Sequence, residues 1–330
     1  MKVTSSRLAI CISLISAMCA HADGAQDCAP IDLRSDALGE ARDQGTIGWC
    51  YAYAAADLLT AKLGKKISAV DVAESYNDTQ LKQRLKHGVR RMEGRLTAEN
   101  FLIESGLVDK ALKRSLHKGL CIEEQFHSKE AAINYTYRNM IALIDSFNSK
   151  ERSFILGSES ISCQDQLSYV QTIFPNVTAE DLRESILNPK RHSVFQRLAE
   201  KACKERIFPE KKITVNNHYY QAGENVQKFS AIDHQLNQGN LVAVSYDFNI
   251  LLNKDAHSDI TKGHTSTIVG RRPNPTDGKC EYLIRNSLGP LCKATYDSRL
   301  KCENGNIWIP KEDLGRQSWG VTYLEMENTN

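Results

Sequence analysis

The sequence predicts an α+β fold in which a helical part is followed by an antiparallel β part. An apolar, alanine-rich run at 52–59 begins a helix that Gly64 is suited to end. Far downstream, two β-branched stretches at 263–270 and 282–285 flank a run of turn-forming residues around Pro275. An early helix and a late hairpin favour separate helical and β parts over an alternating arrangement.

Cys50 stands at the first turn of the predicted helix, six residues after Gln44. Unpaired N–H groups and the positive end of the helix dipole meet at such a position, and both favour the thiolate, which is the nucleophilic form of cysteine. The Gln44 side chain can supply an N–H to an oxyanion that forms above this sulfur. A lone cysteine is more often a buried packing residue, so the interpretation depends on the rest of the chain.

His264 and Asn286 are expected to face each other across the predicted hairpin. They lie equally far from Pro275, so antiparallel pairing about that point brings them nearly opposite one another. An amide oxygen that accepts a hydrogen bond from one ring N–H orients the imidazole and leaves its other nitrogen for a thiol. The order Gln44, Cys50, His264, Asn286 therefore predicts a catalytic cysteine–histidine site.

These motifs resemble those of the papain-like cysteine peptidases. Segment 43–56, DQGTIGWCYAYAAA, is similar to that family's D-Q-G-x-C-G-S-C-W-A-F-S-A signature, while 263–270 and 286–289 resemble its G-H-A-V-x-x-V-G and N-S-W-G blocks. The resemblance covers about residues 28–109 and 228–325. It implies a papain-like two-lobed fold, with a helical lobe and an antiparallel β-sheet or barrel lobe. It also implies the roles of nucleophile for Cys50, general base and acid for His264, orienting residue for Asn286 and oxyanion donor for Gln44.

Two departures from the family pattern lie beside the predicted site. Trp49 replaces a small residue just before the nucleophile, which is expected to bring a large ring near the substrate cleft. Leu288 replaces the tryptophan that shields the His–Asn hydrogen bond in the family, so this bond is expected to be more solvated and weaker.

The resemblance implies hydrolysis of peptide bonds in a polypeptide substrate, without a cofactor, and a protein inhibitor as a further partner. Two alternatives stay open: a cell-wall peptidase or transpeptidase with the same Cys–His chemistry, and an inactive binding protein that keeps the fold. A net charge of +2, without basic runs and interleaved aromatic residues, speaks against nucleic acid. The sequence has no CxxC or HExxH motif of a metal site.

The first 22 residues have the pattern of a secretory signal peptide. Lys2 and Arg7 precede an apolar run at 8–18, which is too short to span a membrane, and 20–22 fit a cleavage site. We therefore expect a secreted or periplasmic protein, with cleavage near Ala22 and no room for a long propeptide. Eight cysteines remain after cleavage, and if Cys50 is free at least one more lacks a partner within the chain. We expect Cys292 and Cys302 to close the loop between them.

The predicted domain order is a signal peptide at 1–22, a helical lobe at 23–109, a helical insertion at 110–215 and a β lobe at 216–330. Within the insertion, Ile133, Tyr137, Met140, Ile144 and Phe147 recur at helix spacing. Segment 178–181 resembles a capping box before a helix at 182–187, and a further helix is expected at 194–203. The insertion is interpreted either as a solvated appendage or as a lid or exosite over the cleft.

Overall fold

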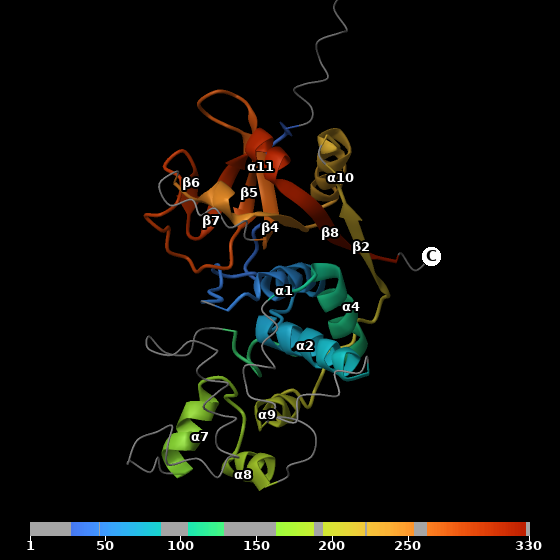
Figure 1. The fold of residues 1–330 in the computed structure, drawn as a ribbon, viewed down its shortest axis with the longest axis vertical. Helices are drawn as coiled ribbons and strands as arrows, with labels where there is room; N and C mark the ends of the chain where they lie inside the picture. The colour runs from blue at the N-terminus through green and yellow to red at the C-terminus, as the bar shows by residue number, and fades with distance from the viewer. Residues whose placement is uncertain are drawn as a thin grey trace, which may run out of the picture.

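The computed structural model describes residues 28–45, 47–86, 105–128, 163–187, 194–221, 223–253 and 263–327. A helical lobe lies against a lobe built on one antiparallel sheet (Figure 1). The expected α+β class, with a helical lobe before an antiparallel β lobe, is confirmed. The predicted signal peptide and the apolar positions from Ile133 to Phe147 lie outside the described residues.

The helical lobe is centred on α1 (Cys50–Leu63), which packs against α2 (Ala69–Lys86), α4 (Val108–Lys118) and the sheet. The predicted end of α1 is confirmed, because Gly64 has a φ of 65° and its N–H donates to the carbonyl of Thr60 at 2.9 Å. Ser68, directly before α2, caps this helix, since its Oγ accepts from the N–H of Asp71 at 3.1 Å. Ala52, Ala54, Ala55 and Ala56 of α1 are buried, and their small size lets α1 approach both its helical neighbours and the sheet.

The sheet is antiparallel throughout its described strands and has the order β2-β8-β3-β4-β5-β7-β6, with β1 paired to β4. The strands are β1 (Ile31–Asp32), β2 (Ile213–Tyr219), β3 (Val242–Asp247), β4 (Gly263–Pro273), β5 (Cys280–Arg285), β6 (Lys301–Glu303), β7 (Asn306–Pro310) and β8 (Ser318–Met326). The predicted hairpin is confirmed as β4–β5, with Ile268 opposite Ile284. Gly278 has a φ of 72° in its turn, a conformation that favours glycine.

Two hydrophobic cores lie on the two faces of this sheet. One is formed with α1 and the helical lobe, and the other with α10 (Asn225–Asn237) and α11 (Lys311–Gln317). Alternate residues of β4 supply both cores, since Ile268 packs into the second and Val269 into the first. The start of α1 is thus held against a strand that is packed on both faces.

Three further helices, α7 (Cys163–Gln171), α8 (Ala179–Leu187) and α9 (Val194–Ala202), lie in the predicted insertion. The capping box is confirmed, because Thr178 and Asp181 exchange side-chain-to-backbone hydrogen bonds of 3.1 Å in both directions. The rings of Phe174 and Phe195 pack against Phe126, with centroids 4.7 and 5.9 Å away, in the same core as α1. The described part of the insertion is therefore not a solvated appendage.

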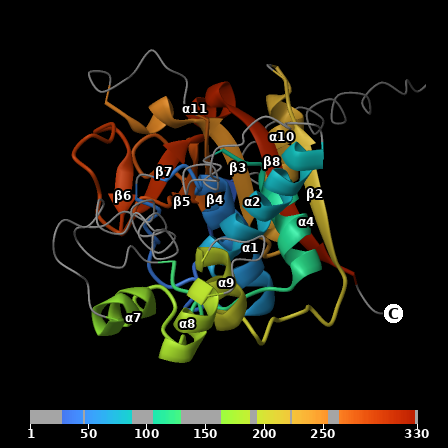
Figure 2. The same ribbon diagram turned by 60° about the horizontal axis from the view of Figure 1, so that its bottom comes forward.

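The placement of these helices bears on the expected lid. In Figure 1, α7 and α8 lie at the end of the molecule away from the sheet, and Figure 2 shows α8 and α9 in front of the helical lobe when that end is turned forward. Helices α7 and α8 thus lie away from the junction of α1 and β4.

Three disulfides join described cysteines: Cys28–Cys280, Cys121–Cys203 and Cys292–Cys302. The expected pairing of Cys292 with Cys302 is confirmed. Cys50 carries a free thiol. Over the ranges that the structure describes, no helix is both long enough and apolar enough to cross a membrane.

Candidate active site

Cys50 is the first residue of α1 and lies where the helical lobe meets the sheet. The turn that leads into it is closed by Trp49, whose N–H donates to the carbonyl of Ile47 at 2.8 Å. The carbonyl of Trp49 then accepts the first hydrogen bond of the helix, from Ala52 at 2.8 Å. The Trp49 side chain is 2% exposed and packs in the core with α1. The ring expected near the cleft therefore anchors the helix start from the interior.

The thiol of Cys50 lies against β4. Burial raises its pKa, while hydrogen bonds from the backbone of Thr265, from the backbone of Tyr51, from its own N–H and from the Thr265 side chain lower it. The N–H groups of the helix start thus act as the sequence predicted, but burial outweighs them. The resting group is a thiol, and the predicted thiolate is wrong for this state of the site.

His264 lies next to two residues that are close to this thiol, Thr265 and Tyr246. Thr265, which donates to the sulfur, follows His264 directly in β4. Tyr246 of β3 is paired with His264, and their rings meet edge to face at 5.5 Å. Burial raises the pKa of the Tyr246 hydroxyl, and the charge of a Cys50 thiolate raises it further, which places the sulfur close to Tyr246 as well. Cys50 and His264 therefore occupy the same small region.

The predicted pairing of His264 with Asn286 is present in the structure. His264 Nε2 lies 2.9 Å from Asn286 Oδ1, and the N–H of Ser287 donates to the same oxygen at 2.9 Å. Because a backbone N–H can only donate, this atom is the amide oxygen, and His264 Nε2 must carry the hydrogen. The other ring nitrogen, Nδ1, is then the acceptor that the thiol requires.

Burial also sets the charge of the imidazole. It lowers the pKa of His264 to about 4, although the hydrogen bond to Asn286 raises it. The imidazole is consequently neutral at neutral pH and is able to accept a proton. Both groups are therefore neutral at neutral pH.

The His264–Asn286 bond is shielded, contrary to the expectation from Leu288. His264 is 7% exposed and Asn286 only 1%. The ring of Phe248, in the 3₁₀ helix η2 (Phe248–Leu251), meets the His264 ring at 5.0 Å, and Asn286 Nδ2 donates to the hydroxyl of Tyr296 at 3.3 Å. Sequence reasoning missed both aromatic residues, because neither lies in a recognisable motif.

Gln44 is fixed beside the same segment. Its N–H donates to the carbonyl of Ser287 at 2.8 Å, and its Oε1 accepts from Ser287 Oγ at 2.5 Å. Its Nε2 donates to the carbonyl of Ile47 at 2.6 Å. An amide nitrogen carries two hydrogens, so the Ile47 carbonyl takes one of them and the second remains for the role of oxyanion donor that the sequence predicts.

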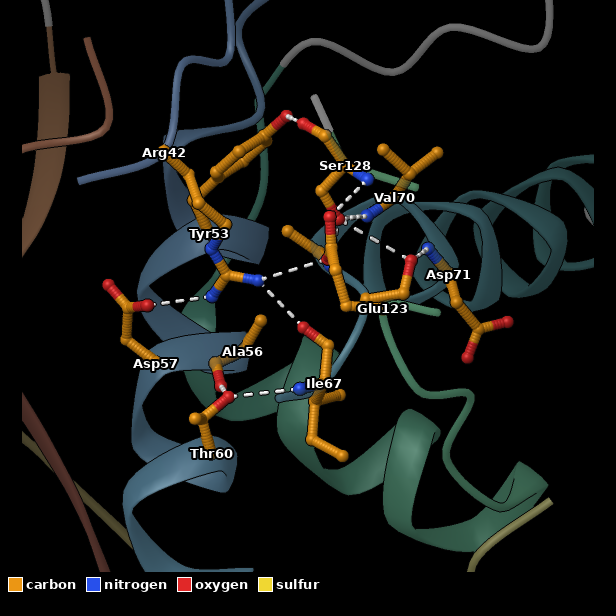
Figure 3. Close-up of polar contacts among 12 residues, drawn as sticks. Arg42, Tyr53, Ala56, Asp57, Thr60, Ile67, Val70, Asp71, Glu123 and Ser128 are labelled. Atoms are coloured by element: carbon orange, nitrogen blue, oxygen red, sulfur yellow. Dashed lines mark hydrogen bonds and ion pairs between the residues drawn. The ribbon is translucent and has the colours of Figure 1, made fainter. Parts of the chain in front are cut away.

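A buried charge cluster joins the segments that carry these residues, and Figure 3 shows the part of it around Arg42 and Asp57. Asp57 of α1 accepts from Arg42 at 2.6 Å and from Arg285, the last residue of β5, at 3.1 Å. Arg42 also donates to the carbonyl of Ile67 at 2.7 Å and lies 3.6 Å from Glu123. Arg42 precedes Gln44 by two residues and Arg285 directly precedes Asn286, so one carboxylate ties together three parts of the site.

The segments that carry the four predicted site residues thus come together where α1 packs against β4. Among the described side chains, no group of three or more His, Cys, Asp or Glu could hold a metal ion.

Comparisons with known proteins gave structural likenesses alone. No protein-family model and no curated protein sequence matches the chain. The structure of digestive procathepsin L 3 of Tenebrio molitor larval midgut is 12% identical with a TM-score of 0.42, and the match covers 90% of this chain and 69% of that one. The recombinant stem bromelain precursor is 12% identical with a TM-score of 0.43, covering 91% and 70%. The proform of the ragweed pollen cysteine protease Amb a 11 is 13% identical with a TM-score of 0.41, covering 91% and 60%.

Proposed function

We propose that this chain is a papain-like cysteine endopeptidase that hydrolyses peptide bonds in polypeptides. One observation carries the proposal: the Asn286 oxygen receives the Nε2–H of His264, which leaves Nδ1 as a base in the region of the Cys50 thiol. The motifs around Gln44, Cys50, His264 and Asn286, which stand in the order of the papain-like family, support it further.

In the proposed reaction, His264 Nδ1 takes the proton of the Cys50 thiol as the sulfur attacks the carbonyl carbon of the scissile bond. The carbonyl oxygen becomes an oxyanion, which receives hydrogen bonds from Gln44 Nε2 and from the backbone N–H of Cys50. The His264 imidazolium returns its proton to the leaving amine, and a thioester remains on Cys50. His264 then deprotonates a water that attacks the thioester, which releases the acid and restores the thiol.

The pKa shifts of Cys50 and His264 fit this sequence of proton transfers. Because the pKa of Cys50 is raised and that of His264 is lowered, the charges of thiolate and imidazolium form together during the attack. Asn286 supports the imidazolium by accepting from Nε2, and the surrounding apolar groups strengthen these interactions.

We also propose that the protein works outside the cytoplasm after removal of residues 1–22. The apolar run at 8–18 and the small residues before Asp23 support this. The three disulfides are consistent with it, because such bonds persist in oxidising compartments.

Single substitutions test the assignment. We expect Cys50→Ala or His264→Ala to lower kcat on a casein-like protein by roughly 10⁴-fold or more, and Asn286→Ala by about 10²-fold. His234→Ala is the matched control, because His234 is an exposed histidine on α10 and should leave turnover unchanged. If the Cys50 and His264 variants retain wild-type rates, the proposal is wrong.

Labelling separates this function from an inactive binding protein. An epoxide-type thiol inhibitor should modify Cys50, as located by peptide mass spectrometry, and His264→Ala should abolish the reaction. Peptidoglycan fragments assayed beside casein distinguish a cell-wall peptidase or transpeptidase, which would act on the fragments and leave casein intact.

A further inference from the structure

The amide of Asn286 is held at both ends. Its oxygen accepts from His264 and from Ser287, while its nitrogen donates to the hydroxyl of Tyr296 at 3.3 Å. Asn286 is 1% exposed and Tyr296 is 7% exposed, so this contact is made away from bulk water. A rotation of the amide by half a turn would oppose two donors at His264 and remove the partner of its nitrogen.

Tyr296 is held in place by a closed loop. The Cys292–Cys302 disulfide joins the two ends of that loop. Within it, the N–H of Tyr296 donates to the carbonyl of Lys293 at 3.1 Å, and Tyr296 forms an antiparallel bridge with Leu252. The position of the hydroxyl thus depends on contacts of the backbone as well as on the ring itself.

The bridge connects Tyr296 to the segment that supports the imidazole. The N–H of Asn253 donates to the carbonyl of Thr295 at 3.0 Å, and the N–H of Asp297 donates to Leu251, the last residue of η2, at 2.9 Å. The same η2 begins with Phe248, whose ring meets His264 at 5.0 Å. These two segments are thus hydrogen-bonded to each other. One brings Phe248 to His264, and the other brings Tyr296 to Asn286.

We propose that Tyr296 is a positioning residue that acts through Asn286: its hydroxyl fixes the amide so that the oxygen faces His264. Together, Tyr296 and Phe248 shield the His264–Asn286 pair from water, which half-buried Leu288 does not do. The inference rests on the proposed peptidase function, because it assigns Tyr296 a part in stabilising the imidazolium of that reaction.

The proposed role of Tyr296 predicts the direction in which the pH profile shifts when its hydroxyl is removed. An oriented Asn286 oxygen stabilises the imidazolium, so a loosened amide should let His264 lose its proton at lower pH. Because neutral His264 is the base, its protonation produces the acidic limb of kcat/KM, and this limb should then move to lower pH. The other titratable groups that face the pair are Cys50 and Tyr246, with Asp43 near Tyr296. Burial raises the pKa of Tyr296, the hydrogen bond to Asn286 lowers it and Asp43 raises it, so with its pKa raised overall it does not itself produce this limb.

The test compares Tyr296→Phe with Tyr282→Phe. Tyr282 is a matched control, because it is a buried tyrosine of β5 whose hydroxyl donates to Asp233 at 3.0 Å, away from the site. We expect Tyr296→Phe to lower kcat about 10-fold at nearly constant KM and to move the acidic limb down by about half a pH unit. Tyr282→Phe should leave the pH profile unchanged. An unaltered profile in Tyr296→Phe overturns the inference.

A double-mutant cycle asks whether Tyr296 acts through Asn286. In an Asn286→Ala background, Tyr296→Phe should have almost no further effect on kcat, whereas a full additional 10-fold loss would overturn the inference. If Tyr296→Phe does not fold, the double variant Cys292→Ala/Cys302→Ala, which opens the loop, takes its place in both measurements.

Alkylation of Cys50 by iodoacetamide, followed against pH, gives a readout that needs no peptide turnover. If the wild type alkylates but cleaves no peptide, the proposed function fails. If the wild type cleaves peptides and the alkylation and rate profiles of Tyr296→Phe match it, only the role of Tyr296 fails.

Discussion

At the scale of single residues, burial decides the protonation of the two reacting groups. His264 has a pKa of about 4 in the fold, against an ordinary value of 6.5. The unfolded chain therefore binds a proton at this residue at a higher pH than the folded chain does. The contribution of neutral His264 to the free energy of unfolding is complete above pH 6.5 and is lost as the pH falls towards 4.

This shift predicts a pH-dependent difference between the wild type and His264→Gln. Between neutral pH and the folded pKa, the wild type should lose roughly 3 kcal/mol more of its free energy of unfolding than the variant. Urea unfolding at pH 7 and at about pH 4, with the disulfides intact, measures it. Parallel losses in both proteins would contradict the low pKa of His264.

Gln44 leads to a second prediction at this scale. Its side chain is held by Ser287 and Ile47, so it is preorganised to stabilise an oxyanion. Gln44→Ala should lower kcat by about 10²- to 10³-fold at nearly constant KM, because the donor acts on the transition state. Ser287→Ala should cause a smaller loss, since it frees Gln44 Oε1 without removing the amide. Steady-state kinetics on a peptide substrate distinguish this from a loss of substrate binding, which would raise KM instead.

The sequence predicted the polar site residues but not their environment. Gln44, Cys50, His264 and Asn286 lie in motifs whose spacing and order can be recognised along the chain. The supports from Phe248 and Tyr296 depend on a bridge between two loops, which leaves no periodic pattern. The thiolate expected at Cys50 was wrong for the same reason: the helix terminus is visible in the sequence, whereas the burial that outweighs it is tertiary.

At the scale of elements, local patterns predicted α1 and the β4–β5 hairpin, while the pairing of β2 with β8 could not be foreseen. These strands lie about a hundred residues apart in the chain, as in the pair Ile213 and Met326. Their pairing depends on the long-range fold of the sheet, which periodicity does not encode. The capping box at Thr178 was predictable because both of its partners lie within one turn.

The element-scale prediction concerns Asp57, which links α1, β5 and the segment before Gln44. The side chains of Arg42, Asp57 and Arg285 are 4%, 8% and 3% exposed, so Asp57→Asn removes the carboxylate partner of buried Arg285 and leaves buried Arg42 with Glu123 at 3.6 Å. Such a loss should lower the free energy of unfolding by about 3–5 kcal/mol, as measured by urea denaturation.

Asp109→Asn is the control for this change. Asp109 pairs with Lys113 at 3.3 Å along α4, and the Lys113 side chain is 59% exposed. A pair of this kind contributes about 0.5 kcal/mol or less. Equal losses in the Asp57 and Asp109 variants would show that the buried cluster does not hold the elements together.

At the scale of the whole molecule, the described helices of the predicted insertion are part of the fold rather than an addition to it. Phe174 and Phe195 share a core with α1, and the Cys121–Cys203 disulfide ties the end of α9 to the segment after α4. A deletion of about 112–212 would therefore remove part of the core. A test of the insertion requires a change that leaves its packing residues in place.

Opening one disulfide at a time makes such a test. The Cys121–Cys203 bond spans 82 residues and lies in the helical lobe, whereas Cys292–Cys302 spans 10 residues and closes the loop of Tyr296. The double variant Cys121→Ala/Cys203→Ala should lose roughly 2–5 kcal/mol of unfolding free energy and keep its kcat on a short peptide. The variant Cys292→Ala/Cys302→Ala should lose less stability, because the loop is short, but should lower kcat, because Tyr296 is no longer held against Asn286. Urea unfolding and peptide kinetics on both proteins give the comparison. A loss of kcat in the first variant while it remains folded would mean that the inserted helices contribute to the site as well as to the core.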